Sequence, residues 1–196
     1  ICTIQKERRC MVNRASALET NYKIGSVKVD KKITLIFKEI RDLDIKQIAA
    51  WPLTIESVGL KLASIINEKD APGFNEAFSN KNKHVLRTEP LKWWMIGESN
   101  IEITSEEGTI IDLSHAFTSI EIKGESVIKF LNRHLPLDLR EQSFPVNSIA
   151  SSAIHHVSVK IWRTDNGYRL FIPRGFALSI WEILLETASQ FGYEIL

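Results

Sequence analysis

Residues 111–135 read IDLSHAFTSIEIKGESVIKFLNRHL, and a change of periodicity inside this stretch indicates the fold. Over residues 116–123 the side chains alternate between two faces, with isoleucines on one of them, which is the period of a half-buried strand. Gly124 interrupts this alternation. Over residues 126–135 the apolar side chains follow helical spacing instead. The stretch therefore predicts a strand, a break and a helix.

The residues that follow continue this pattern of strands and helices. Residues 157–163 and 168–172 alternate on either side of an Asn-Gly dipeptide, which tolerates positive φ and is a strong hairpin signal. Residues 175–191 carry one apolar stripe at helical spacing, and Gly192 is the expected C-cap of that helix. The order of strand, helix, strands and helix predicts a ferredoxin-like unit.

The first half of the chain predicts elements of the same kinds. Residues 33–40 have the composition of a strand, and residues 54–66 form a predicted helix capped by its first residue, a threonine. Gly59 lies inside that helix at a cost of about 1 kcal/mol relative to alanine, so we expect a close contact there. Residues 84–97 predict a hairpin that turns at its proline, and residues 101–104 predict a short strand.

These elements predict an α+β fold of two packed subdomains, each an antiparallel sheet with flanking helices. We place the first subdomain at residues 16–105 and the second, ferredoxin-like one at residues 106–196. Residues 1–15 are charged and lack an apolar core, so we expect a disordered leader rather than a signal peptide. The two cysteines, Cys2 and Cys10, lie in that leader. Because disulfides then cannot hold the folded body together, a reducing compartment such as the cytoplasm is favoured.

Composition and charge disfavour several classes of function. The chain has 196 residues and a net charge of +1, whereas a protein that follows a phosphate backbone normally has a basic excess, so we expect no nucleic-acid partner. No apolar run approaches the ~18 residues of a membrane helix, so we expect no membrane partner. The nine glycines are dispersed and form no phosphate-binding loop, so we expect no nucleotide, NAD or FAD in this chain.

Two histidine-containing groups suggest chemistry at first sight. Asp112, Ser114 and His115 are close neighbours at the entrance of a strand, and residues so placed fix a turn rather than form a Ser-His-Asp relay. His155 and His156 are expected on a strand, where neighbours point to opposite faces and cannot share a metal ion. We therefore predict no catalytic, cofactor-binding or metal-binding residue in this chain.

Tryptophan and arginine residues are the candidates for a partner interface, because both types are enriched at interface centres. Trp93 and Trp94 are neighbours on a strand, so one of them faces out of the sheet unless another element covers it. Trp162, Arg163 and Arg174 could extend the same patch. The alternative is an ordinary core with arginine side chains lying along its surface, and the pattern leaves both interpretations open.

Several motifs, taken in order, resemble those of one protein superfamily. Residues 112–115, the strand end at 120–124 and the helix that contains Phe130-Leu131 resemble a segment of the glycine-cleavage T-protein, or folate-binding, superfamily. A narrower resemblance, to the gamma subunit of heterotetrameric sarcosine oxidase, rests on residues 137–140, 144–145, 161–163, 170–177, Trp181 and residues 190–192. The resemblance runs from about residue 16 to residue 192.

The resemblance implies a T-protein-like fold and a structural role in a larger complex. Complexes of this kind oxidise sarcosine to glycine and release formaldehyde or form methylenetetrahydrofolate. The implied partners are larger, flavin-bearing alpha and beta subunits and a small delta subunit. FAD, FMN, NAD, zinc and tetrahydrofolate are expected in those other subunits, and no cofactor in this chain.

Folate-binding relatives carry a carboxylate on a strand beyond the helix, where a general base is needed. Residues 142–164 of this chain contain no Asp or Glu, which favours a non-catalytic gamma-type subunit. A stand-alone folate-binding or aminomethyltransferase-like protein is the alternative, and the missing carboxylate and the short length count against it. An RNA-associated folate-type domain is a third interpretation, which the near-zero net charge disfavours.

Overall fold

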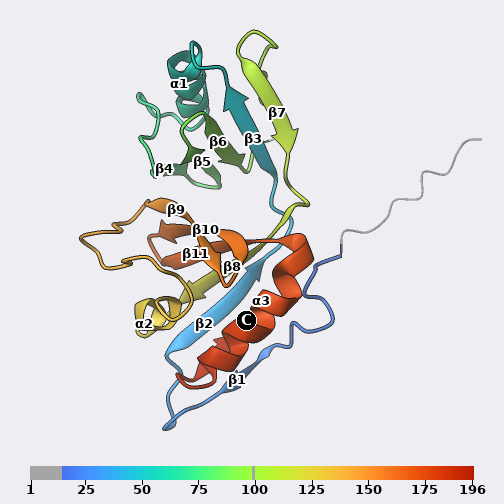
Figure 1. The fold of residues 1–196 in the computed structure, drawn as a ribbon, viewed down its shortest axis with the longest axis vertical. Coiled ribbons are helices and arrows are strands. Elements are labelled where there is room, and N and C mark those ends of the chain that lie inside the picture. Colours follow the sequence, from blue (N-terminus) through green and yellow to red (C-terminus); the bar gives the residue numbers. More distant parts are fainter. Residues whose placement is uncertain (1–14, 99) are drawn as a thin grey trace, which may run out of the picture.

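The computed structural model describes residues 15–98 and 100–196, which form two β-sheets with helices on their outer faces (Figure 1). The predicted disordered leader, with Cys2 and Cys10, lies outside the described residues except for Ala15. The predicted α+β class, with two packed antiparallel sheets and flanking helices, is confirmed.

The smaller sheet has five strands in the order β4-β5-β6-β3-β7. Its strands are β3 (Ile45–Ala50), β4 (Ala77–Asn80), β5 (Lys83–Glu89), β6 (Lys92–Ile96) and β7 (Gly108–Asp112). Helix α1 (Ile55–Ile65) covers one face of this sheet. On that face Trp93 and Met95 of β6 join Val58 and Leu62 of α1 in one apolar cluster.

The larger sheet has seven strands in the order β1-β12-β2-β8-β11-β10-β9. These are β1 (Gly25–Val27), β2 (Leu35–Ile40), β8 (Phe117–Lys123), β9 (Ile149–Ile154), β10 (Val157–Thr164), β11 (Gly167–Pro173) and β12 (Tyr193–Ile195). Helices α2 (Val127–Leu131) and α3 (Ala177–Ala188) cover its outer face. There Ile120 and Leu170 pack in one cluster with Trp181 and Leu184 of α3. None of the helices in the described part of the chain is long and apolar enough to cross a membrane.

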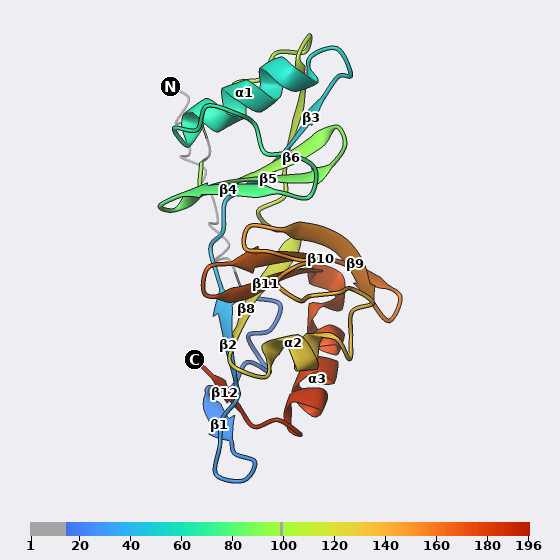
Figure 2. The ribbon, with the colours of Figure 1, turned by 90° about the vertical axis from the view of Figure 1, so that its left-hand side faces the viewer.

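The two sheets face each other through a third apolar cluster. Trp94 and Ile96 of the smaller sheet meet Trp162 and Phe171 of the larger one. The Trp94 and Phe171 rings lie 5.4 Å apart at 90°, an edge-to-face geometry that adds about 0.5–1.5 kcal/mol beyond the burial of area. Figure 2 shows α1, the smaller sheet and strands β9 to β11 stacked in succession. The smaller sheet is therefore covered on both faces.

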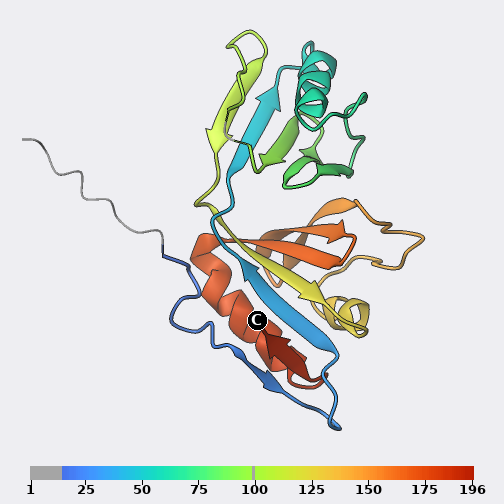
Figure 3. The same cartoon turned by 180° about the vertical axis from the view of Figure 1, so that it is seen from behind.

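Local signals predicted the hairpins correctly. The turn at Pro90 joins β5 to β6, and the Asn-Gly turn joins β10 to β11. Elements β8, α2, β10, β11, α3 and β12 follow one another in the ferredoxin-like order expected of the second half, with β9 as an addition. Strand β2 is inserted in that sheet between β12 and β8, parallel to β12, and Figure 3 shows this arrangement from behind.

Some helix and strand boundaries differ from the prediction, because hydrogen bonds of polar groups set them and hydrophobic periodicity does not reveal those bonds. Helix α2 ends at Leu131 rather than at residue 135, because the chain tightens into turns, with His134 N donating to Leu131 O at 2.9 Å. The Thr54 side chain does not cap α1 but donates to Glu107 O at 2.6 Å. Residues 101–104 form no strand.

The expectation that Gly192 is the C-cap of α3 is also wrong. The helix ends at Ala188, and Ser189 is its C-cap. Gly192 lies beyond that cap with φ +75°, where a Cβ atom would come within 2.4 Å of Lys32 O. The glycine therefore serves the turn into β12 rather than the helix end.

The division into subdomains at residues 16–105 and 106–196 stays a prediction. The two sheets do not divide there. Strand β2 pairs with β8 and β12 of the larger sheet, and β7 pairs with β3 of the smaller one. Long-range strand pairing of this kind leaves no local mark in the sequence.

Replacement of Gly59 by alanine tests the close contact at α1. An added Cβ would lie 2.8 Å from Ala71 Cβ and 3.3 Å from the Trp93 ring. Overpacking costs about 1–3 kcal/mol, which outweighs the gain of about 1 kcal/mol in helix propensity. We expect Gly59→Ala to lower the free energy of unfolding by about 1 kcal/mol in urea titrations. Leu60→Ala, on the exposed side of the same helix, is the control, and a stabilised Gly59→Ala protein would contradict the packing described.

Candidate functional site

A groove opens between the two sheets beside their apolar contact. It has a volume of about 500 Å³ and is lined from both sheets, by His84 and Asn82 near β5 and by Arg169 of β11. A second hollow of about 270 Å³ shares His84 and Arg169 and adds Trp162 and Glu121 to the lining. Two ionisable side chains from different sheets thus border both spaces.

Arg169 lies in a row that crosses three strands. It is paired with Trp162 of β10 on one side and with Glu121 of β8 on the other. Residues paired in this way point to the same face of a sheet, which here is the face toward the smaller sheet. The guanidinium carbon lies 5.1 Å from the Trp162 ring centroid, and burial lowers the pKa of Arg169, an effect that Glu121 partly offsets. The position holds a charge in a poorly hydrated place.

His84 approaches the same row from β5. Its ring lies 4.8 Å from the Trp162 ring at 62°, and its Nδ1 shares a 2.9 Å hydrogen bond with Ser79 Oγ. Burial, assisted by the positive charge of Arg169, lowers the pKa of His84 from 6.5 to about 4. The imidazole is therefore neutral at pH 7 and a weak base.

The Ser79–His84 pair does not form a nucleophilic relay. No carboxylate among the described residues hydrogen-bonds to the His84 ring, so nothing orients it in the way a triad requires. A base of such low pKa also takes a proton from serine poorly.

Asp112 and Ser114, which were not expected to form a catalytic triad with His115, do fix a turn, as predicted. Ser114 N donates to Asp112 Oδ1 at 2.9 Å, and Ser114 Oγ accepts from Ile45 N at 3.0 Å. Asp112 also pairs with Lys46 at 2.7 Å, which together with Ser114 holds the pKa of Asp112 well below its usual range. These contacts join the end of β7 to the start of β3.

The expected strand position of His155 and His156 is wrong. Both lie in the turn between β9 and β10, with exposed rings, and His155 adopts φ 51°. Within residues 15–98 and 100–196, no group of three or more His, Cys, Asp or Glu residues is arranged to hold a metal ion.

The five candidate interface residues do not form one surface patch. Trp93, Trp94 and Trp162 are 1%, 0% and 2% exposed, so none of the three indoles is accessible to a partner. Arg163 donates to Phe144 O at 2.6 Å and pairs with Glu141, and Arg174 is exposed and donates to Ala15 O at 2.7 Å. Neither Trp93 nor Trp94 faces solvent, because α1 covers one face of their sheet and the larger sheet covers the other.

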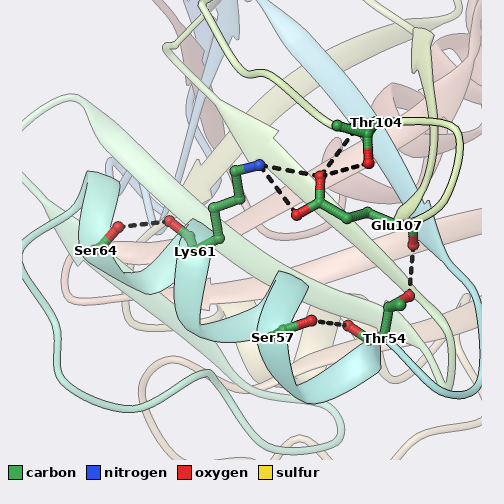
Figure 4. A network of polar contacts seen from close by, with 6 residues as sticks. All are labelled: Thr54, Ser57, Lys61, Ser64, Thr104 and Glu107. Atoms are coloured by element: carbon green, nitrogen blue, oxygen red, sulfur yellow. Dashed lines mark hydrogen bonds and ion pairs between the residues drawn. The ribbon is translucent and has the colours of Figure 1, made fainter.

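A polar network at α1 is structural as well (Figure 4). Lys61 Nζ lies 3.1 Å from both carboxylate oxygens of Glu107, and Glu107 Oε2 accepts from Thr104 N at 2.9 Å. Thr54 Oγ1 donates to the backbone carbonyl of Glu107. These contacts tie the loop before β7 to α1.

The fold belongs to the class seen in glycine-cleavage T-proteins. The aminomethyltransferase T of the glycine cleavage system from Bartonella henselae superposes with a TM-score of 0.57 over 84% of this chain and 48% of that one, at 11% identity. The predicted T-protein-like fold is thus confirmed. No protein-family model matches the chain.

A more specific similarity is to sarcosine oxidase. A chain of the heterotetrameric sarcosine oxidase from Corynebacterium sp. U-96, solved with pyrrole 2-carboxylate, superposes with a TM-score of 0.76 over 91% of this chain and 96% of that one, at 19% identity. In sequence, this chain is 29% identical over 82 residues to the sarcosine oxidase subunit gamma of Arthrobacter sp. and 28% identical over 90 residues to that of Corynebacterium sp. strain P-1. The predicted resemblance to the gamma subunit is confirmed. The matched regions span 40% and 44% of those relatives' lengths.

The lowered pKa of His84 predicts how stability depends on pH. The unfolded chain binds a proton at this residue near the ordinary pKa of 6.5, whereas the folded chain does so only near 4. The free energy of unfolding should therefore fall as the pH is lowered from 6.5 to 4, and His134, whose pKa burial also lowers, acts in the same direction.

His84→Gln should reduce that fall by about 1–2 kcal/mol, a value that allows for the solvent still reaching the ring. Urea titrations across this pH range measure it, with His156→Gln, which removes an exposed histidine, as the control. If the free energy of unfolding depends on pH in the same way in His84→Gln and in the original chain, burial does not lower the pKa of His84 and its ring is hydrated.

Proposed function

We propose that this chain is a non-catalytic, gamma-type subunit of a heteromeric sarcosine oxidase. The observation that carries the proposal is the similarity to subunits named gamma in two genera, together with a fold that extends over 96% of a chain in a solved heterotetrameric sarcosine oxidase. Because the sequence matches span less than half of the curated relatives, the activity, substrate and partners are part of the proposal.

The absence of a catalytic role is supported by the residues beyond α2. The folate carboxylate of T-protein relatives is expected near β9, where this chain has Ser151 and Ser152. Lys160 Nζ donates to Ser151 Oγ at 2.9 Å, so a cation lies beside the strand where a base would be needed. These residues do not fit the folate amine, and we assign no step of a folate reaction to this chain.

In the proposed complex, the reaction takes place in other subunits. Flavin-bearing alpha and beta subunits would oxidise sarcosine to glycine, with formaldehyde or methylenetetrahydrofolate as the one-carbon product. FAD, FMN, NAD, zinc and tetrahydrofolate would be held there and by a small delta subunit, in the cytoplasm. This chain would cover surface of its larger partners and help to shape the assembly.

Co-purification tests the assignment. The chain is tagged and expressed with its neighbouring reading frames, and the captured material is examined for flavin absorbance and for sarcosine-dependent oxygen uptake. We expect a yellow complex with larger subunits that consumes oxygen with sarcosine, while the tagged chain expressed alone is colourless.

A flavin-loaded preparation of the chain alone would contradict the proposal. So would a lone, colourless protein in the co-expression experiment that binds tetrahydrofolate tightly, since that result favours a stand-alone folate-binding protein. An untagged culture carried through the same purification is the control for adventitious flavoproteins.

A further inference from the structure

Arg169 is a half-buried cation whose Nε is enclosed without a hydrogen-bond partner. A guanidinium has five N–H donors in a fixed fork. The Nε atom of Arg169 is enclosed and has no hydrogen-bond partner, and no ion pair or hydrogen bond joins its side chain to another described residue. The contact with Trp162 uses the ring face and satisfies none of these donors. A desolvated charge left in this condition destabilises the folded chain.

The neighbours of Arg169 neutralise its charge only in part. Glu121 is paired with it across β8 and β11, but the Glu121 carboxylate forms its ion pair with Lys123, at 2.8 Å. The nearest imidazole, His84, is neutral at pH 7 and is bonded to Ser79. The part of the fork that can reach a partner borders the groove and the adjoining hollow, because Arg169 lines both.

The shape and charge of the two spaces restrict the ligand. Their volumes of about 500 and 270 Å³ fit a small molecule rather than a large one. Acidic side chains outnumber basic ones in their lining, with Asp42, Asp44, Glu98, Glu121 and Asp165 against Arg41, Lys81 and Arg169. A multiply charged anion would be repelled by these carboxylates, whereas a single planar carboxylate matches the fork of an arginine.

We propose that the groove between the two sheets binds a small monocarboxylate, which the guanidinium of Arg169 holds against the Trp162 ring. The inference does not depend on the sarcosine oxidase assignment. Three observations support it: a half-buried arginine whose Nε has no hydrogen-bond partner, an open space beside that arginine, and a lining with an excess of acidic side chains. Binding would supply a carboxylate hydrogen-bonded to Arg169, which no described residue provides.

Benzoate, benzamide and phosphate, titrated into the purified chain, test the proposal. Benzamide has the shape of benzoate without its charge, and phosphate has a higher charge. Binding is followed by the rise in melting temperature and by the NMR shift of the Trp162 indole N–H, which reports on the site itself. We expect saturable binding of benzoate only, with the Trp162 signal moving.

Variants of Arg169 test whether its guanidinium binds the carboxylate. Arg169→Met should weaken benzoate binding roughly tenfold to a hundredfold, as expected for the loss of charge-assisted hydrogen bonds, and should not lower the stability of the ligand-free chain. Arg169→Lys, which keeps the charge but loses the fork, should bind more weakly than the original chain. Arg140→Met is the matched control, because Arg140 is an exposed arginine paired with Asp138, and it should bind as the original chain does.

Three results would overturn the inference. The first is equal benzoate binding by the original chain and Arg169→Met. The second is equal binding of benzoate and benzamide, which would mark an apolar site. The third is a strongly destabilised Arg169→Met chain together with undiminished binding by Arg169→Lys, since the arginine would then have a purely structural role.

Discussion

The rings of Trp94, Trp162 and Phe171 join the two sheets, and the remaining features depend on this contact. It buries the second face of a sheet whose first face already packs against α1. The contact fills the centre of the space between the sheets with aromatic rings, so only its margin stays open. At that margin His84 and Arg169, one from each sheet, both lie against the Trp162 ring. The candidate site is thus a by-product of how two twisted sheets stack.

The sequence predicts those hairpins and helices whose positions depend on neighbouring residues. Turn residues locate both hairpins, and helical spacing locates α1 and α3, because these signals act over a few residues. The partner of β2 and the covering of Trp94 depend on contacts between distant segments, so alternation within one strand could not predict them. The candidate site also depends on contacts between distant segments, so the sequence did not predict it. His84 and Arg169 stand in different hairpins, and no spacing pattern in the chain links them.

Stability and binding make opposite demands on the space between the sheets. An apolar side chain at position 169 would suit the free chain better than an arginine whose enclosed Nε has no hydrogen-bond partner. His84 is likewise kept neutral only by burial against a cation and an indole. Side chains that lower the stability of the folded chain in this way are typical of functional positions. Binding explains the presence of these two side chains better than packing does.

The position of β2 has a consequence for the order in which the chain folds during synthesis. The smaller sheet uses a continuous run of the chain, from β3 to β7, so it can form while later residues are still inside the ribosome. Strand β2, made earlier, has to wait for β8 and then for β12, which pairs with it through Tyr193–Ile195. Until those last residues emerge, an unpaired apolar strand is held beside a finished sheet. A nascent chain in that state exposes an edge that chaperones recognise and that a neighbouring copy could capture.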